Sequence, residues 1–112
     1  MPSEFEKRRY PRADLVFKLK YFQDQGSSWS AVTKDISEGG VSFETKTLQT
    51  EGSELTLAFA LEGLQGEIVA RGQVIRSWEE SGRHYTAVLF TKIDESDREI
   101  IYQYIHDHME SA

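Results

Sequence analysis

The chain has 112 residues, of which 38% are hydrophobic and 29% are charged, and its formal net charge is −6 at pH 7. This length and balance suit one compact domain with a single core, and they exclude a fibrous or an intrinsically disordered chain. Because there is no cysteine and no apolar run near the roughly 20 residues of a membrane span, we also exclude disulfides, thiolate chemistry and membrane insertion, and we expect a cytoplasmic protein.

The N-terminal end of the chain is basic, although the chain as a whole is acidic. Residues 1–20 hold six lysines and arginines against three acids, a charge of +3, whereas the rest holds seven against sixteen, a charge of −9. We expect residues 1–12 to form a flexible basic arm, since they have few apolar anchors to offset the entropy of ordering. The clustered cations of this arm are Lys7, Arg8, Arg9 and Arg12. A solvated tail would explain such a cluster, and so would a small anionic ligand.

Alternation of apolar and polar residues with a period of two dominates the chain after the arm. It predicts six strands separated by turn-like stretches such as DQGSS, DISEGG and EGLQG. Gly72 lies inside the fifth of these strands, where it predicts a bulge or a bend. We expect the two tryptophans and the phenylalanines to fill the core. The predicted strands cover about residues 15–21, 29–34, 41–45, 54–62, 67–78 and 84–90. Short strands at this spacing are typical of an antiparallel barrel closed on itself.

Only the last segment has a helical period. Ser96 followed by Glu99 is a capping-box pattern, and the apolar residues that follow recur at helical spacing. They are Ile101, Tyr104 and Ile105, with His108 on the same face. We therefore expect a mainly β domain of residues 13–112, in which an amphipathic helix of about residues 96–109 packs on a six-stranded barrel.

Two short patterns flank the first two predicted strands. Arg8 and Arg12 form RxxxR just before the first, and Asp35, Ser37 and Gly40 form DxSxxG at the end of the second. In this order, on six strands and a terminal helix, they make the chain resemble a stand-alone PilZ domain over about residues 7–104. The resemblance implies a bacterial receptor that binds the second messenger cyclic di-GMP, which is a ligand and not a cofactor. It also implies an unidentified downstream protein, to which the signal passes through changed protein contacts.

The arginines suit this ligand chemically. A guanidinium bonds to the N7 and O6 acceptors of a guanine edge with two parallel hydrogen bonds, and it pairs equally well with phosphate. We therefore expect Arg8 and Arg12 to be the main ligand residues, with Arg9 as a further donor that can also stack on a base. Lys7 stands where the resemblance implies an influence on whether one or two ligands bind.

The DISEGG stretch supplies the complementary groups. Asp35 can accept from the N1–H and N2–H groups of guanine, and Ser37 can offer a hydroxyl to a phosphate or a base. Gly39 and Gly40 would let the backbone come close to the ligand in a conformation that a Cβ would forbid. Taken alone, Asp35 and Ser37 are explained equally well by side-chain bonds that close their own turn.

Three positions in the last two predicted strands bear on the site. Arg71 and Arg76 are out of phase in the fifth strand and would face opposite sides unless a bulge intervenes. We include Arg76 as a candidate ligand residue. Ala87, in the stretch AVLF, stands where strands of the resembled family often carry glycine.

Three other classes of function compete with a nucleotide receptor. The main alternative is a PilZ-like protein-interaction module that binds no nucleotide. A small barrel that binds nucleic acid polymers is disfavoured by the acidic body and by the lack of a basic strip with interleaved aromatics. Catalysis is disfavoured because the sequence places no base beside Ser37 and has no nucleophile elbow. With three scattered histidines and no cysteine, we expect no metal centre.

Overall fold

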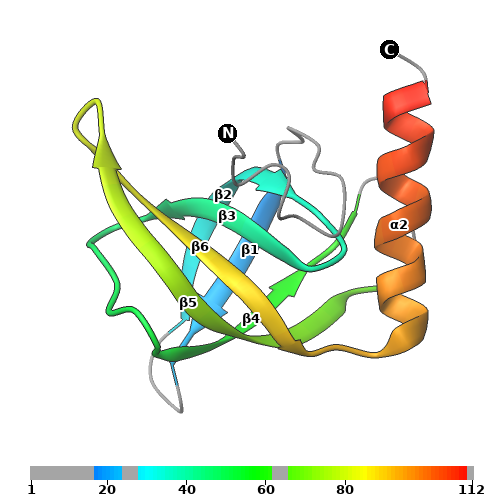
Figure 1. The fold of residues 1–112 in the computed structure, drawn as a ribbon, viewed down its shortest axis with the longest axis horizontal. Helices are drawn as coiled ribbons and strands as arrows, with labels where there is room; N and C mark the ends of the chain where they lie inside the picture. Colours follow the sequence, from blue (N-terminus) through cyan, green and yellow to red (C-terminus); the bar gives the residue numbers. More distant parts are fainter. Residues whose placement is uncertain (1–16, 24–27, 62–65, 111–112) are drawn as a thin grey trace, which may run out of the picture.

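The computed structural model describes residues 17–23, 28–61 and 66–110. They form β1 (Lys18–Phe22), β2 (Ser28–Ile36), β3 (Gly40–Thr45), β4 (Glu54–Phe59), β5 (Ile68–Glu80), β6 (Arg83–Lys92) and α2 (Glu95–Glu110). All strand pairs are antiparallel and close into a barrel in the order β1-β2-β3-β6-β5-β4, with β4 beside β1 (Figure 1). The predicted six-stranded barrel with a C-terminal helix is confirmed. The arm and its boundary at residue 12 lie outside the described residues.

The barrel core consists of the side chains that one phase of each strand turns inward. In β4, Leu55, Leu57 and Phe59 are each at most 2% exposed. Leu57 lies opposite Tyr21 of β1 and Ala70 of β5, so the inward side chains of neighbouring strands meet. Each such side chain contributes about 1.5–3 kcal/mol by leaving water. The apolar phase of each strand therefore faces the core, and the other phase faces outward, where a ligand or a partner can bind.

The register shifts beside Gly72, as predicted, but the extra residue of this bulge belongs to β6 and not to β5. Arg71 pairs with Lys92 and Gly72 pairs with Phe90, which leaves Thr91 of β6 outside the pairing. A Cβ built on Gly72 would lie 2.2 Å from Cγ1 of Val88, so β6 crosses too close for any side chain here. Glycine is required at this point of β5 because of this close approach.

A second bulge, whose extra residue lies in β5, was not predicted. The register shifts again between Val74 and Arg76, which leaves Ile75 unpaired. Ile75 and Arg76 are consequently both exposed, and Ser77 turns inward, where its Oγ lies 3.1 Å from Oγ1 of the fully buried Thr86. The bulge thus places both arginines of β5 on the outer surface, although their spacing alone would put them on opposite faces.

Both tryptophans lie outside the core, which corrects the prediction that they fill it. Trp29 is 44% exposed near the start of β2, and the Lys46 ammonium lies 5.4 Å from its ring centre. Trp78 follows the second bulge and stacks on Tyr85, with ring centres 5.8 Å apart. The prediction holds for the buried phenylalanines, which are Phe43, Phe59 and Phe90.

The hairpin between β5 and β6 is tighter than predicted. Its turn has only Ser81 and Gly82, with φ angles of 54° and 80°. Two residues with positive φ give the kind of turn whose twist matches that of paired strands. The strands can therefore pair up to the turn, and β5 and β6 run longer than the sequence indicated, to Glu80 and from Arg83.

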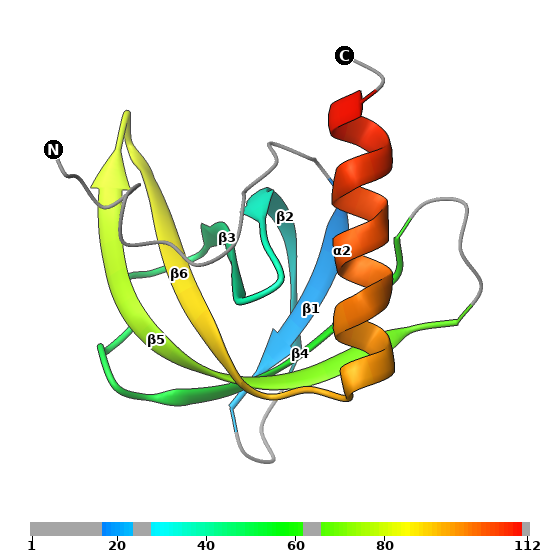
Figure 2. The ribbon, with the colours of Figure 1, turned by 45° about the vertical axis from the view of Figure 1, so that its right-hand side comes forward.

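Helix α2 lies against one side of the barrel in both views (Figures 1 and 2). Its Ile101, Tyr104 and Ile105 belong to the core cluster, as predicted, whereas the side chain of His108 lies outside the described part. The predicted capping box is wrong, because the backbone N–H of Arg98 donates to the carbonyl of Asp94 at 3.0 Å, which makes Asp94 the N-cap. Within the described residues, no helix is long and apolar enough to cross a membrane.

Candidate functional site

The DISEGG turn between β2 and β3 is closed by its own hydrogen bonds. The backbone N–H of Ser37 donates to the Gly40 carbonyl at 2.8 Å, and that of Gly39 donates to the Ser37 hydroxyl at 3.1 Å. The same hydroxyl lies 3.4 Å from the Gly40 carbonyl, and Ser37 is only 5% exposed. Ser37 thus closes its own turn, the role that the sequence alone left open.

Gly40 is required by the fold, for a reason different from the one predicted. A Cβ on Gly40 would lie 2.2 Å from the Val88 carbonyl oxygen of β6, and its φ is not in the positive region. The neighbouring strand is held close by the Phe90 N–H, which donates to the Gly39 carbonyl at 2.8 Å. The lack of space beside β6, and not a special backbone conformation, therefore requires glycine at position 40.

Strand pairing brings Asp35 and Arg76 into one row across the outer surface. Asp35 of β2 pairs with Ser42 of β3, Ser42 pairs with Ala87 of β6, and Ala87 pairs with Arg76 of β5. Residues directly opposite one another on neighbouring strands share a face. We call these four residues the cross-strand row. It spans three strand spacings, about 14 Å, with a carboxylate at one end, a guanidinium at the other and two small side chains between them.

Ala87 lies in the middle of this row, at the position where strands of the resembled family often carry glycine. Ala87 and Ser42 are 8% and 3% exposed, so the centre of the row is buried and only its Asp35 and Arg76 ends are accessible. The sequence did not single out Ser42, because its neighbours in the strand gave no motif. Only the register of β3 between β2 and β6 identifies it.

An aromatic and cationic cluster adjoins the Arg76 end of the row. The Arg76 guanidinium lies 4.4 Å from the ring centre of Trp78, and Lys34 lies 4.7 Å from that of Tyr85. The Trp78 ring N–H donates to Glu80 at 3.2 Å, which lowers the pKa of that carboxyl together with the charge of Lys34. Flat rings under cations are suited to stacking with bases and planar guanidinium groups. Trp78 is the site residue that sequence analysis missed, because it assigned this residue to the core.

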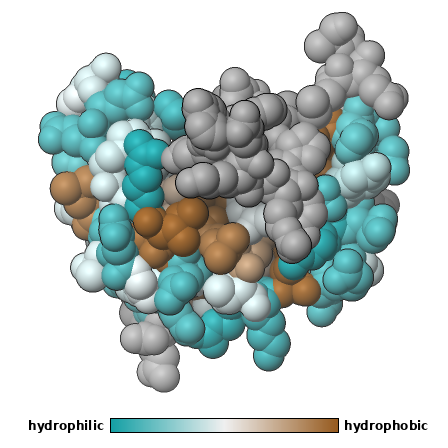
Figure 3. All heavy atoms as spheres, in the orientation of Figure 1, coloured by the Kyte–Doolittle hydropathy of each residue, from teal (hydrophilic) through white to brown (hydrophobic). Residues whose placement is uncertain are grey.

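Apolar side chains border the row on the same face. Figure 3 shows a hydrophobic patch over β5 and β6, with hydrophilic residues to its left and below it. Ile75 precedes Arg76 in β5, and Leu89 of β6 pairs with Gly40; they are 48% and 46% exposed. The surface beside the row can therefore bind the apolar faces of a ligand or of a protein segment.

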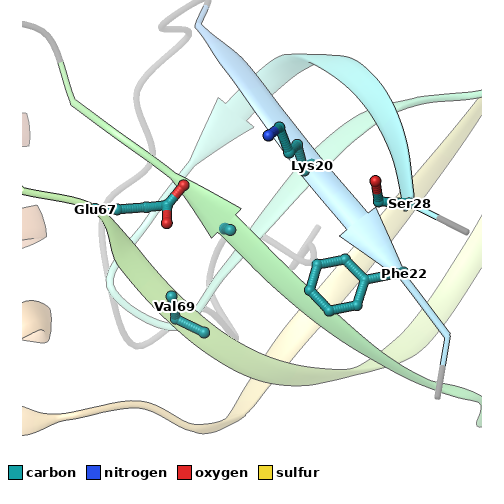
Figure 4. Close-up of a pocket in the computed structure, with 6 residues that line it drawn as sticks. Lys20, Phe22, Ser28, Glu67 and Val69 are labelled. Atoms are coloured by element: carbon teal, nitrogen blue, oxygen red, sulfur yellow. The ribbon is translucent and has the colours of Figure 1, made fainter. Parts of the chain in front are cut away.

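A hollow of about 430 Å³ opens on β1, β4 and the starts of β2 and β5 (Figure 4). Its lining includes none of the residues predicted to bind a ligand. One cation and one anion lie among mostly small or apolar groups, so its charges are balanced and do not favour a dianion. The lining residues are Lys20, Phe22, Ser28, Ala58, Glu67 and Val69.

The family follows from comparison with known proteins. A family model described as the PilZ domain matches residues 6–107. The chain belongs to the PilZ domain family. The PilZ domain of Escherichia coli YcgR, solved with c-di-GMP, aligns with a TM-score of 0.71 at 15% identity, over 94% of this chain and 93% of that one.

Two longer proteins contain the same fold. The Bacillus subtilis inhibitor of motility, MotI/DgrA, aligns with a TM-score of 0.85 at 20% identity, over 93% of this chain and 52% of its own. MrkH of K. pneumoniae, solved as a c-di-GMP complex, aligns with a TM-score of 0.74 at 20% identity, over 93% and 53%. This chain thus spans about half the length of both, and at such identities the likeness shows the fold alone. Among curated protein sequences, none matches the chain.

The predicted ligand residues of this PilZ domain divide into two groups. Asp35, Ser37, Gly39, Gly40 and Arg76 lie on or beside the turn and the cross-strand row. The cations of the RxxxR segment, which are Lys7, Arg8, Arg9 and Arg12, lie outside the described residues. Among the residues that the structure does describe, no group of three or more His, Asp or Glu side chains could hold a metal ion.

The DISEGG turn also contacts helix α2 through Glu38. An Arg98 guanidinium nitrogen donates to the Glu38 backbone carbonyl at 3.2 Å. Burial raises the pKa of the Glu38 carboxyl, and the charges of Arg98 and His106 offset part of this effect. The ionised carboxylate therefore carries a desolvation cost that its neighbours only partly offset.

We expect Glu38→Gln to stabilise the protein at neutral pH by roughly 0.5 kcal/mol, because the amide has no charge to desolvate. The folded-state pKa lies above the unfolded value, so the cost grows as pH rises between the two and is fully present above the folded value. Below the ordinary value of 4.5, the difference from wild type should vanish. Thermal unfolding at neutral pH and at a pH below 4.5 measures this difference in stability, with the exposed Glu51→Gln as control. An equal gain in stability at the two pH values would contradict the prediction.

Proposed function

We propose that this PilZ domain is a cyclic di-GMP receptor. The observation that carries the proposal is the cross-strand row, which sets the carboxylate of Asp35 and the guanidinium of Arg76 on one outer face beside the DxSxxG turn. Related PilZ domains in YcgR and MrkH have been solved with this ligand. Retention of both RxxxR arginines, Arg8 and Arg12, supports the same function.

In this proposal each group has a separate role. Arg8 and Arg12, with Arg9 and Lys7 as further cations, bind phosphates and guanine Hoogsteen edges. Asp35 accepts from the Watson–Crick edge of a guanine. Arg76 on Trp78 gives a flat cationic surface at the other end of the row, on which a base can stack.

The signal leaves through changed protein contacts. The ligand neutralises the repulsion among the arm cations and draws residues 1–12 over the row, which presents a new surface to a downstream protein. This role requires neither catalysis nor a cofactor, and it suits a bacterial cytoplasmic receptor.

A protein-interaction module that binds no nucleotide is the second candidate. One observation favours it: the Ser37 hydroxyl accepts a hydrogen bond within its own turn, and β6 lies too close to Gly40 for any side chain there. These two positions of DxSxxG would then be kept for the turn without any ligand. The hydrophobic patch at Ile75 and Leu89 would be the contact surface.

A calorimetric titration separates the two candidates. We expect cyclic di-GMP to bind with micromolar or tighter affinity, about −8 kcal/mol or better, and cyclic di-AMP far more weakly. Adenine replaces the O6 acceptor of guanine with an N6 donor, which the arginine fork cannot bond.

Fluorescence gives an independent readout of the same titration. Trp29→Phe removes an exposed ring, which leaves Trp78 as the single tryptophan beside Arg76. Its emission should change with cyclic di-GMP and not with cyclic di-AMP. Equal affinity for the two dinucleotides, or no binding of either, overturns the receptor and leaves the interaction module.

A further inference from the structure

Three elements hold the carbonyl groups of the DISEGG turn. The Gly40 carbonyl is bonded within the turn by Ser37, and the Gly39 carbonyl is bonded by the Phe90 N–H of β6. The Glu38 carbonyl accepts from Arg98 of α2, a residue 60 positions away in the chain. The turn therefore takes its shape from the barrel on one side and from the helix on the other.

The Arg98 side chain is held between the turn and its own helix. This side chain is only 25% exposed, and Nε lies 4.0 Å from Glu95, one turn earlier in the helix. Three residues further along the helix, Ile101 is fully buried in the core cluster. A displacement of the turn that pulls on Arg98 is therefore passed to α2, whose apolar face packs in the core.

The outward side of α2 carries exposed rings. Tyr102 is 40% exposed and its ring centre lies 4.1 Å from that of His106. The charge of His106 acts on Glu38, so His106 lies within electrostatic reach of the turn. The helix thus connects the turn to a surface that a partner protein can contact.

We propose that Arg98 is a positioning residue that couples the ligand-binding turn to helix α2. It holds the Glu38 carbonyl and so fixes the path of the backbone through Gly39 and Gly40, without touching the ligand itself. The part of this inference that concerns ligand binding rests on the proposed function. By linkage, a ligand that tightens the turn also changes α2, and a partner that binds α2 changes ligand affinity by the same factor.

The decisive variant is Arg98→Met, which keeps the length of the side chain and removes its donors. We expect altered amide chemical shifts at Gly39 and Gly40 in the free protein and cyclic di-GMP binding about tenfold weaker. Arg98→Lys, which keeps the charge, should recover part of the loss. Arg71→Met is the matched control, since Arg71 is exposed and pairs with Glu54 at 2.7 Å.

Coupling has its own readout, which a purely structural role would not move. In the wild type, saturating cyclic di-GMP should shift the ring resonances of Tyr102 and His106; in Arg98→Met at saturation it should leave them unchanged. Wild-type shifts at both rings in the Met variant overturn the coupling. If the wild type binds no cyclic di-GMP, the receptor function fails, and unchanged Gly39 and Gly40 amides in free Arg98→Met then overturn the positioning role as well.

Discussion

Replacing Arg8 or Arg12 by alanine is expected to weaken cyclic di-GMP binding by about 2–4 kcal/mol, roughly 30- to 1000-fold. Each substitution removes a bidentate, charge-assisted pair with a phosphate or a guanine edge. The melting temperature should hardly change, because the described core is built from the six strands and α2. Calorimetric titration and thermal unfolding of the same samples measure the two effects.

Two further variants make this result specific. Arg12→Lys keeps the charge but loses the planar fork, so it should recover only a small part of the affinity. Arg71→Ala removes an exposed cation from another part of the outer surface and should leave affinity at the wild-type value. Arginine variants that melt well below wild type and still bind ligand would show that the arm is structural and that its assigned role is wrong.

The barrel was predictable because its cause is local. Leu55, Leu57 and Phe59 alternate with less apolar residues, and a strand with one apolar face must bury that face against another layer of strands or helices. The helix was predictable for the same reason, from the spacing of Ile101 and Ile105. Its start was not, because Ser96 and Asp94 are both acceptable caps and the sequence pattern favoured the wrong one.

The candidate site was only half predictable, because its other half depends on register. Asp35 and Ser37 belong to a motif and could be identified at once. Ser42 and Trp78 belong to none, and their positions depend on pairings between strands distant in sequence. A single unpaired residue, Ile75, reverses the faces of everything after it in β5. Alternation counted from Ile68 therefore cannot say which way Trp78 points.

Gly40→Ala is expected to destabilise the fold by about 3 kcal/mol or more, a loss of roughly 10–15 °C in melting temperature for a domain of this size. The added methyl would lie 2.2 Å from the Val88 carbonyl oxygen, which is backbone and cannot rotate away. Relief requires β3 and β6 to separate where Gly40 pairs with Leu89, and that disturbs the bonds of the turn as well. Thermal unfolding measures the loss.

The comparison with Gly82→Ala separates lack of space from backbone strain. Gly82 has a φ of 80° and nothing within 4 Å of an added methyl, so alanine there costs only the strain of that conformation, about 1–2 kcal/mol. If Gly40→Ala melts below Gly82→Ala, the glycine of DxSxxG is kept for packing against β6, and any loss of ligand follows from a distorted turn. If Gly40→Ala melts like wild type and loses only cyclic di-GMP, the glycine exists for the approach of the ligand and the packing explanation is wrong.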